Sequence, residues 1–136
     1  MSRYIIVDTD IFSCLWQNRS VPDGFIDALR NTTPVLSFVT VGEVRFGARN
    51  ANWGQKRLEQ LSAAMRPYVI APYALELANL WGDLKHEAKK RGLPLGHSAH
   101  SNDLWICATA VHYGAPLMTN NTRHFESLPG LQLVRP

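Results

Sequence analysis

The stretch YIIVDTDIFS, residues 4–13, joins a run of apolar side chains directly to two carboxylates. Residues 4–7 have the length of a strand, and their continuous apolar character predicts burial on both faces, as in a parallel sheet. Asp8 and Asp10 follow where that strand ends. Three interpretations of the pair stay open at this point: turn acids that begin a helix, ligands of a metal ion, or the reactive groups of a phosphate-transfer enzyme.

The rest of the chain alternates short apolar runs with helical patterns. Further strands are expected at residues 35–39, 68–71, 117–119 and 131–134. Helices are expected at residues 11–18, 22–30, 41–49, 53–65, 73–91 and about 101–113, with a helical turn at 122–128, with Thr40 as a helix N-cap and with Ser101 or Asn102 as another. Strands separated by helices predict one α/β domain over residues 1–136, with a mostly parallel central sheet between two helical layers.

Composition limits the class of protein. The 136 residues are 46% hydrophobic, which suits a domain that buries a core and argues against disorder. A formal charge of +3 permits a polyanionic partner without requiring one. The start of the sequence lacks a secretory signal pattern, and no apolar run is long enough to span a membrane, so we expect a cytoplasmic protein. Cys14 and Cys107 lie in apolar contexts and are expected to be reduced and buried.

Four oxygen-bearing side chains stand where ligands bind in parallel sheets, beyond the carboxyl ends of the strands. Asp8 follows the first strand, and Glu43 lies in the first turn of the helix after the second. Asp103 lies in the first turn of the helix before the strand "PLMT", and Asn121 follows that strand. Clustered carboxylates repel one another, and a divalent cation removes that cost. Oxygen ligands favour Mg²⁺ or Mn²⁺ over Zn²⁺.

Structural interpretations compete with this one. Glu43 and Asp103 could supply only favourable first-turn charge, worth about 0.3–1 kcal/mol each. His97 and His100 are three residues apart, but no second pair completes a zinc site. We interpret them as loop histidines that lie close enough along the chain to Asp103 to touch a substrate.

Four segments of this chain resemble, in order, the motifs of PIN-domain proteins, and most of all the VapC toxins of bacterial VapBC toxin–antitoxin systems. The segments are "IIVDTDIFS", "LSFVTVGEVRFGA", "NDLWICATAVHYGAPLMTNN" and "TRHFESLPGLQLV". The resemblance implies a three-layer α/β/α sandwich. It also implies a Mg²⁺- or Mn²⁺-dependent endoribonuclease that cleaves RNA with a metal-activated water. Such toxins are typically homodimers, and a small cognate antitoxin lays an amphipathic segment in a groove on the toxin.

Carried over residue by residue, the resemblance gives Asp8, Glu43 and Asp103 the acidic metal-site positions. Thr119 matches the supporting hydroxyl after the late strand, and Asp10 is expected beside the site as a helix-start or supporting residue. Asn121 stands where many relatives carry aspartate. Its amide offers an oxygen without a charge, which favours one metal ion over two.

Basic residues near these motifs are candidates for contact with RNA or with the antitoxin. Arg45, Arg49 and Arg123 neighbour the motif residues and can attract phosphates. The competing interpretation is a solvated helix face.

Two alternative functions stay open in the sequence. A haloacid-dehalogenase-like phosphatase would use Asp8 as nucleophile and Asp10 as acid/base, although no later acid pair follows Asp103. A catalytically weak RNA-binding PIN module is suggested only by Asn121.

Overall fold

The computed structural model describes residues 3–136, and four short strands form one parallel sheet in it. The strands are β1 (Tyr4–Val7), β2 (Thr33–Ser37), β3 (Val69–Ala71) and β4 (Leu117–Met118), in the spatial order β3-β2-β1-β4. Each pairing between neighbours is parallel. The predicted first strand is confirmed at both ends, because its apolar run stops where Asp8 begins.

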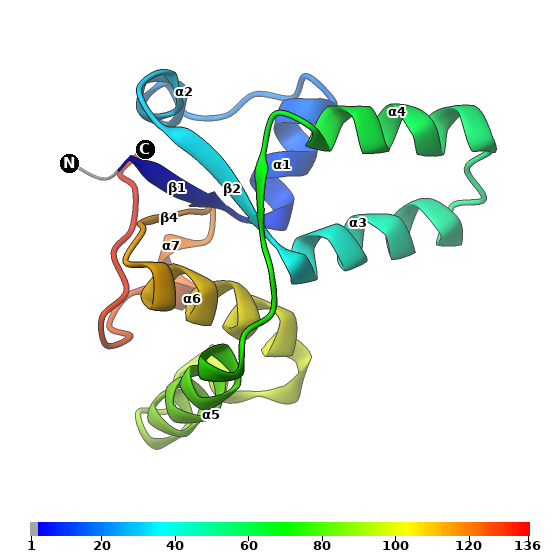
Figure 1. The fold of residues 1–136 in the computed structure, drawn as a ribbon. Helices are drawn as coiled ribbons and strands as arrows, with labels where there is room; N and C mark the ends of the chain where they lie inside the picture. Colours follow the sequence, from blue (N-terminus) through cyan, green and yellow to red (C-terminus); the bar gives the residue numbers. More distant parts are fainter. Residues whose placement is uncertain (1–2) are drawn as a thin grey trace.

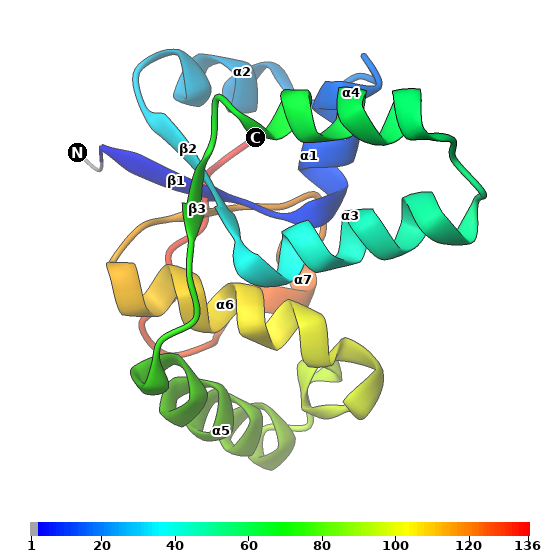
Figure 2. The ribbon, with the colours of Figure 1, turned by 45° about the vertical axis from the view of Figure 1, so that its right-hand side comes forward.

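Helices connect the strands and cover both faces of the sheet. They are α1 (Thr9–Trp16), α2 (Asp23–Arg30), α3 (Phe38–Asn50), α4 (Gln55–Met65), α5 (Leu75–Lys90), α6 (Ser101–Tyr113) and α7 (Thr122–Phe125), with single 3₁₀ turns at Pro94–Gly96 and Ser98–His100. Figures 1 and 2 show α5 and α6 together on one side of the sheet, while α3 and α4 extend side by side away from it. The predicted three-layer α/β/α architecture is confirmed.

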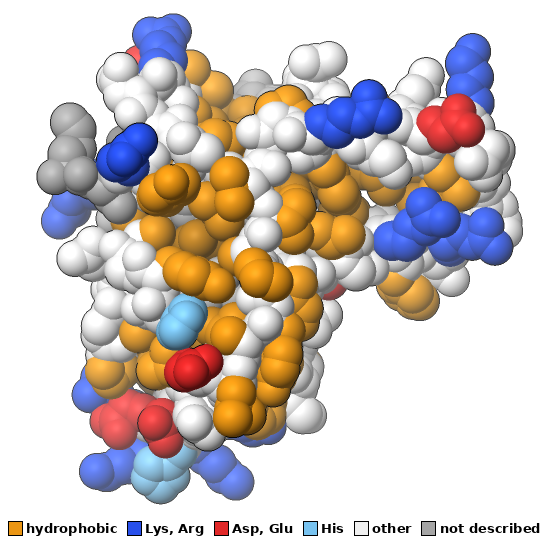
Figure 3. Space-filling model, in the orientation of Figure 1, with side chains coloured by type: hydrophobic (Ala, Val, Ile, Leu, Met, Phe, Trp, Pro, Cys, Tyr) orange, Lys and Arg blue, Asp and Glu red, His pale blue; other side chains and the backbone are white. Residues whose placement is uncertain are grey.

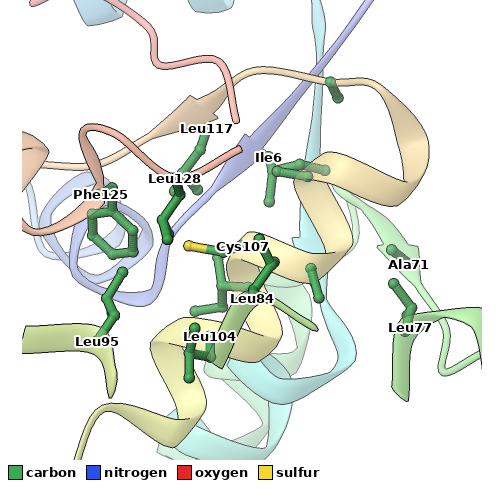
Figure 4. Close-up of a cluster of buried hydrophobic side chains, with 14 of the residues drawn as sticks. Ile6, Ala71, Leu77, Leu84, Leu95, Leu104, Cys107, Leu117, Phe125 and Leu128 are labelled. Carbon is green, nitrogen blue, oxygen red and sulfur yellow. The ribbon is translucent and has the colours of Figure 1, made fainter. Parts of the chain in front are cut away.

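The period of two along each strand divides the core between the two layers. Ile6 packs with α5 and α6, whereas its neighbours Ile5 and Val7 pack with the helices of the opposite layer. Figure 4 shows Cys107 of α6 in the middle of the cluster that contains Ile6, among leucines from α5 and β4. Burial on both faces explains why β1 is continuously apolar.

The strand order reverses once, and this reversal places the site. The chain proceeds from β1 to β2 to β3 in one direction and then returns to add β4 on the free side of β1. In open parallel sheets, ligands bind at the carboxyl ends of the strands beside such a switch point. Asp8 and Thr119, the residues that follow β1 and β4, flank it.

Several predicted boundaries are wrong, and the second strand matters most. It runs from Thr33 to Ser37 rather than over residues 35–39, and α3 begins at Phe38. Ser37, not Thr40, is the N-cap, because its hydroxyl accepts a hydrogen bond from the backbone N–H of Val39 at 3.2 Å. Glu43 therefore lies in the second turn of α3 rather than the first.

The C-terminal part differs from the predicted pattern as well. Residues 131–134 form no strand and contribute one isolated parallel bridge, between Leu117 and Leu133. His100 is the N-cap residue of α6 in place of the expected Ser101 or Asn102, and its side chain makes no capping hydrogen bond to the helix backbone. Both cysteines are free as expected, but only Cys107 is buried and Cys14 is half-buried. Over residues 3–136, no helix combines the length and the apolar character needed to cross a membrane.

Candidate active site

Asp8 joins the sheet to the first helix. Its backbone N–H donates to the carbonyl of Met118 in β4 at 3.1 Å, which fixes it beside the switch point. Its carboxylate accepts a hydrogen bond from the N–H of Ile11 at 2.8 Å and caps α1. The residue is 6% exposed. The structure therefore buries a carboxylate at the edge of the sheet and satisfies it only in part.

The pKa of Asp8 is raised from 3.8 to about 6, and burial is the main cause. Within that net shift, the negative charges of Asp10 and Asp103 also raise the pKa, while the Thr119 hydroxyl and the Ile11 N–H lower it. A carboxyl group that is desolvated and repelled by other acids is held at a cost in the metal-free protein, and a cation would relieve that cost.

The metal-free protein is expected to lose stability as the pH rises from about 4 to about 6. The folded state holds the Asp8 proton more tightly than the unfolded chain, so stability from this group is complete below the unfolded pKa of 3.8 and lost through the folded value of about 6. The loss corresponds to about 3 kcal/mol. Urea unfolding in EDTA at several pH values, compared with Asp8→Asn, measures it; a pH-independent difference between the two proteins would contradict it.

Thr119 and Asn121 lie on the other side of the switch point. Thr119 is fully buried, and its hydroxyl accepts a hydrogen bond from the backbone N–H of Asn121 at 3.1 Å. The hydroxyl proton is then free to point to Asp8, which agrees with the finding that Thr119 lowers the pKa of Asp8. Asn121 precedes α7 and its side chain is exposed. This half of the site brings a hydroxyl and an amide, but no third carboxylate.

Glu43 reaches the site from α3 and is held by a residue that the sequence analysis did not single out. Thr9, between the two acids of the opening motif, donates its hydroxyl hydrogen to Glu43 Oε1 at 2.8 Å. The same hydroxyl lies 3.0 Å from that of buried Thr40. Thr9 and Thr40 stand 31 residues apart, and only the parallel pairing of β1 with β2 brings them together. Sequence spacing gave no signal for this contact.

Asp103 completes the acidic set from the first turn of α6. Its charge raises the pKa of Asp8 and also that of Cys107, whose thiol is shifted mainly by burial. The carboxylate is half-buried and contacts the ring of His100 at its Oδ2 atom. The structure thus brings Asp8 and Asp103 within electrostatic reach of each other.

The acidic residues fit an open site for a magnesium-like ion better than a site in which protein side chains supply every ligand. Among residues 3–136, no group of three or more His, Cys, Asp or Glu side chains is arranged to hold an ion, so Glu43 does not join the two aspartates as a preformed third ligand. Mg²⁺ usually binds through one or two carboxylates, with water and substrate phosphate completing its octahedron. Asp8 and Asp103 supply that number of carboxylates.

The other predicted residues lie around this centre. Asp10 is exposed in the first turn of α1 and acts on the site through its charge. Arg45 and Arg49 are exposed on α3, and Arg123 is exposed on α7, two residues after Asn121. All three side chains are free to meet a polyanion, although they do not enclose the acids.

Two hollows meet at Glu43. One, of about 210 Å³, lies between α1, α3 and α4 and is lined by Thr9, Trp16, Glu43, Gly47, Trp53 and Leu61 among others. The other, of about 540 Å³, lies on the opposite side of α3 and is lined by Phe38, Val39, Gly42, Glu43, Phe46 and Asn102. Glu43 therefore lines both hollows, whereas Asp8 and Asp103 line neither.

Comparison with known proteins connects this geometry with a family. The PIN-domain family matches residues 5–131. The VapC ribonuclease Y4jK of Sinorhizobium fredii is 32% identical over 97% of this chain and 96% of its own length. The solved structure of VapBC-1 from nontypeable Haemophilus influenzae matches at 25% identity with a TM-score of 0.79, over 96% of each chain. A toxin–antitoxin complex from Klebsiella pneumoniae matches at 26% identity with a TM-score of 0.64, over 96% of this chain and 98% of its own.

Proposed function

The chain belongs to the PIN-domain family, and on that premise we propose that it is a metal-dependent endoribonuclease and the toxin of a type II toxin–antitoxin system. One observation supports this most directly: Asp8 is a buried carboxylate at the switch point with its pKa raised to about 6 by burial and by neighbouring acids. The relatives named ribonuclease VapC supply the substrate class. Membership in this family, with Asp10 exposed, leaves the phosphatase alternative without support.

The site residues have separate roles in the proposed reaction. Asp8 and Asp103 would hold one Mg²⁺ or Mn²⁺. The Thr119 hydroxyl would orient the Asp8 carboxylate through a hydrogen bond. Glu43, held by Thr9, would act on the site through its charge or through a bridging water rather than as a direct ligand. A bound ion of this kind lowers the pKa of water and neutralises the charge that develops on a phosphate. Since Asn121 is uncharged and exposed, we assign one ion rather than two.

The proposal is tested with purified chain freed of any antitoxin. We expect cleavage of structured RNA with Mg²⁺ or Mn²⁺ and none with EDTA, and calorimetry with Mn²⁺ in the absence of RNA should detect one ion per chain. A protein that binds RNA but neither cuts it nor binds Mn²⁺ would be the inactive RNA-binding module instead.

Arg45, Arg49 and Arg123 steer the RNA by phosphate attraction, so binding should weaken as salt rises.

The hollow between α1, α3 and α4 is the site that we propose for the antitoxin. Trp16, Trp53 and Leu61 give it apolar walls, and the Arg57 guanidinium lies 4.0 Å from the Trp53 ring centroid. Thr9 and Glu43 add polar groups to its lining. An amphipathic helix suits it, with apolar side chains in the hollow and a basic side chain directed at the acids. Such a segment would block the site as well as bind beside it.

Gly47→Leu is expected to weaken antitoxin binding by about tenfold or more, because the new side chain would occupy the hollow. A Cβ at Gly47 meets nothing within 4 Å, so the first atom of the new side chain introduces no clash in the toxin itself. Gly82→Leu on α5 is the matched control, since Gly82 is equally unobstructed and lies outside the hollow. Calorimetry with the small protein encoded beside the gene measures both; equal affinities would place the antitoxin elsewhere.

A separate apolar face is proposed as the homodimer interface. β3 forms an edge of the sheet, and a hollow of about 320 Å³ beside it is lined by Tyr4, Val69, Ile70, Pro72, Tyr113 and four buried apolar side chains. Figure 3 shows hydrophobic side chains gathered across the face that β3 crosses. A patch of this size without lining charge suits a partner with the same surface, because a two-fold axis matches a patch to itself.

Ile70→Lys is expected to convert the dimer to a monomer. Ile70 is 42% exposed on the edge strand, so a lysine there is solvated in the monomer but desolvated in the dimer. Light scattering after size exclusion measures the mass. Ser62→Lys, on the exposed side of α4, is the control and should remain dimeric. A monomeric wild type, or a dimeric Ile70→Lys variant, would contradict this interface.

A further inference from the structure

His100 lies against one corner of the acidic site. It ends the 3₁₀ turn Ser98–His100, and its Nδ1 atom is 3.4 Å from Oδ2 of Asp103. This distance is at the long end for a hydrogen bond, as is common in sites that tighten only when loaded. On its other side the His100 ring meets the ring of His124 edge to face, with 5.7 Å between centroids. His124 belongs to α7, which follows Asn121.

We infer that His100 is a positioning residue that donates from Nδ1 to Oδ2 of Asp103, and so would leave Oδ1 of that carboxylate free to hold a divalent cation. The inference rests on the proposed function, because it assumes that Asp103 is a ligand. The histidine acts through Asp103 and does not itself touch the ion or the RNA.

The other two acids show why Asp103 needs such a partner. Asp8 is fixed by the Ile11 N–H and adjoins the Thr119 hydroxyl, and Glu43 is fixed by the Thr9 hydroxyl. Within residues 3–136, the contact to Asp103 comes from His100. The Asp103 side chain is 42% exposed, so without that contact water would let the carboxylate rotate. Partners of this kind fix the orientation of a ligand and are worth 10–100-fold in metal affinity.

The ring of His124 gives the contact its direction. An edge-to-face pair holds both ring planes, and the His100 side chain is 30% exposed, so its ring is already confined. The pair also connects the segment before α6 with α7. The orientation of Asp103 therefore depends on the segment that follows β4 as well as on its own helix.

The test is Mn²⁺ affinity measured by calorimetry without RNA. His100→Ala should weaken binding by about 10- to 100-fold. His100→Asn should stay within about threefold of wild type, because its amide nitrogen can stand where Nδ1 stands and keep the donor. His97→Ala, exposed in the same loop, is the matched control and should bind as wild type does.

The outcomes separate this inference from the proposed function. If Asp8→Asn abolishes Mn²⁺ binding but His100→Ala does not change it, the inference is wrong and the metal site stands. If the wild type binds no Mn²⁺ in an Asp8-dependent way, the proposed function fails first. Equal weakening in His100→Ala and His100→Asn would exclude a donor role. A fall in the melting temperature of metal-free His100→Ala that accounts for its weaker binding would show a structural role and overturn the inference.

Discussion

Asp8→Asn is expected to reduce RNA cleavage by about three orders of magnitude. In the proposed site, the substitution removes a charged ligand of the ion. Its loss should cost several kcal/mol of the stabilisation of charge on the phosphate, and each 1.36 kcal/mol corresponds to a factor of ten in rate. Initial rates on a defined RNA at saturating Mg²⁺ measure the effect. Asp10→Asn is a close control, because Asp10 is an acid two residues away that is exposed on α1. It should cleave within a few-fold of wild type.

The same variant is expected to be more stable than wild type when no metal is present. Asparagine is as good an N-cap as aspartate, so the bond from the Ile11 N–H is kept while the buried charge is lost. The gain above pH 6 should approach the roughly 3 kcal/mol that corresponds to the shift of the Asp8 pKa from 3.8 to about 6. Added Mn²⁺ should stabilise wild type and leave Asp8→Asn unchanged. Full activity in a well-folded Asp8→Asn would exclude Asp8 as a ligand.

Asp103→Asn is the second large effect, with an expected loss of about a hundred- to a thousandfold in turnover. Asp103 is more exposed than Asp8, so water can replace more of what its carboxylate supplies and we expect a smaller loss. Removing its charge also lowers the pKa of Asp8 towards its ordinary value, since the two carboxylates repel each other. The metal-free variant should therefore be at least as stable as wild type.

The control for this second variant is Asp83→Asn, an acid exposed on α5 away from the acidic residues. Thermal unfolding in EDTA accompanies the rate measurements for both proteins. Unchanged turnover in Asp103→Asn would remove it from the metal site. A large loss of stability would instead make it a structural residue of the α6 N-terminus.

The local sequence predicted the parts of the site that depend on the end of a single strand. The apolar run that stops at Asp8 predicted both β1 and the position of that acid, because burial on two faces leaves no room for a charge before the strand ends. The same logic misplaced the start of α3. Ser37 and Thr40 are both good N-caps, and β2 ends at the first of them. The pairing of Ser37 with Ala71 of β3 fixes that strand end, and the local sequence does not show this pairing.

Contacts between distant segments were beyond the sequence. Thr9 looked like a spacer between two acids, yet it holds Glu43 across 34 residues. His100 looked like a loop residue, and its packing on His124 depends on where α7 lies after β4. The expected third ligand shows the same limit, because chain order placed Glu43 at the correct edge but could not place it within coordinating distance of two aspartates.

The hydrogen bond between Asp8 and Met118 joins residues that lie about 110 positions apart in a chain of 136. Synthesis makes the first acid about 110 residues before the strand that completes its surroundings. A nascent chain therefore carries an open half of the site while those residues are made, and Thr119 reaches Asp8 only when β4 adds to the sheet. This order of assembly delays the appearance of a complete nuclease site until β4 has been made and has paired with β1.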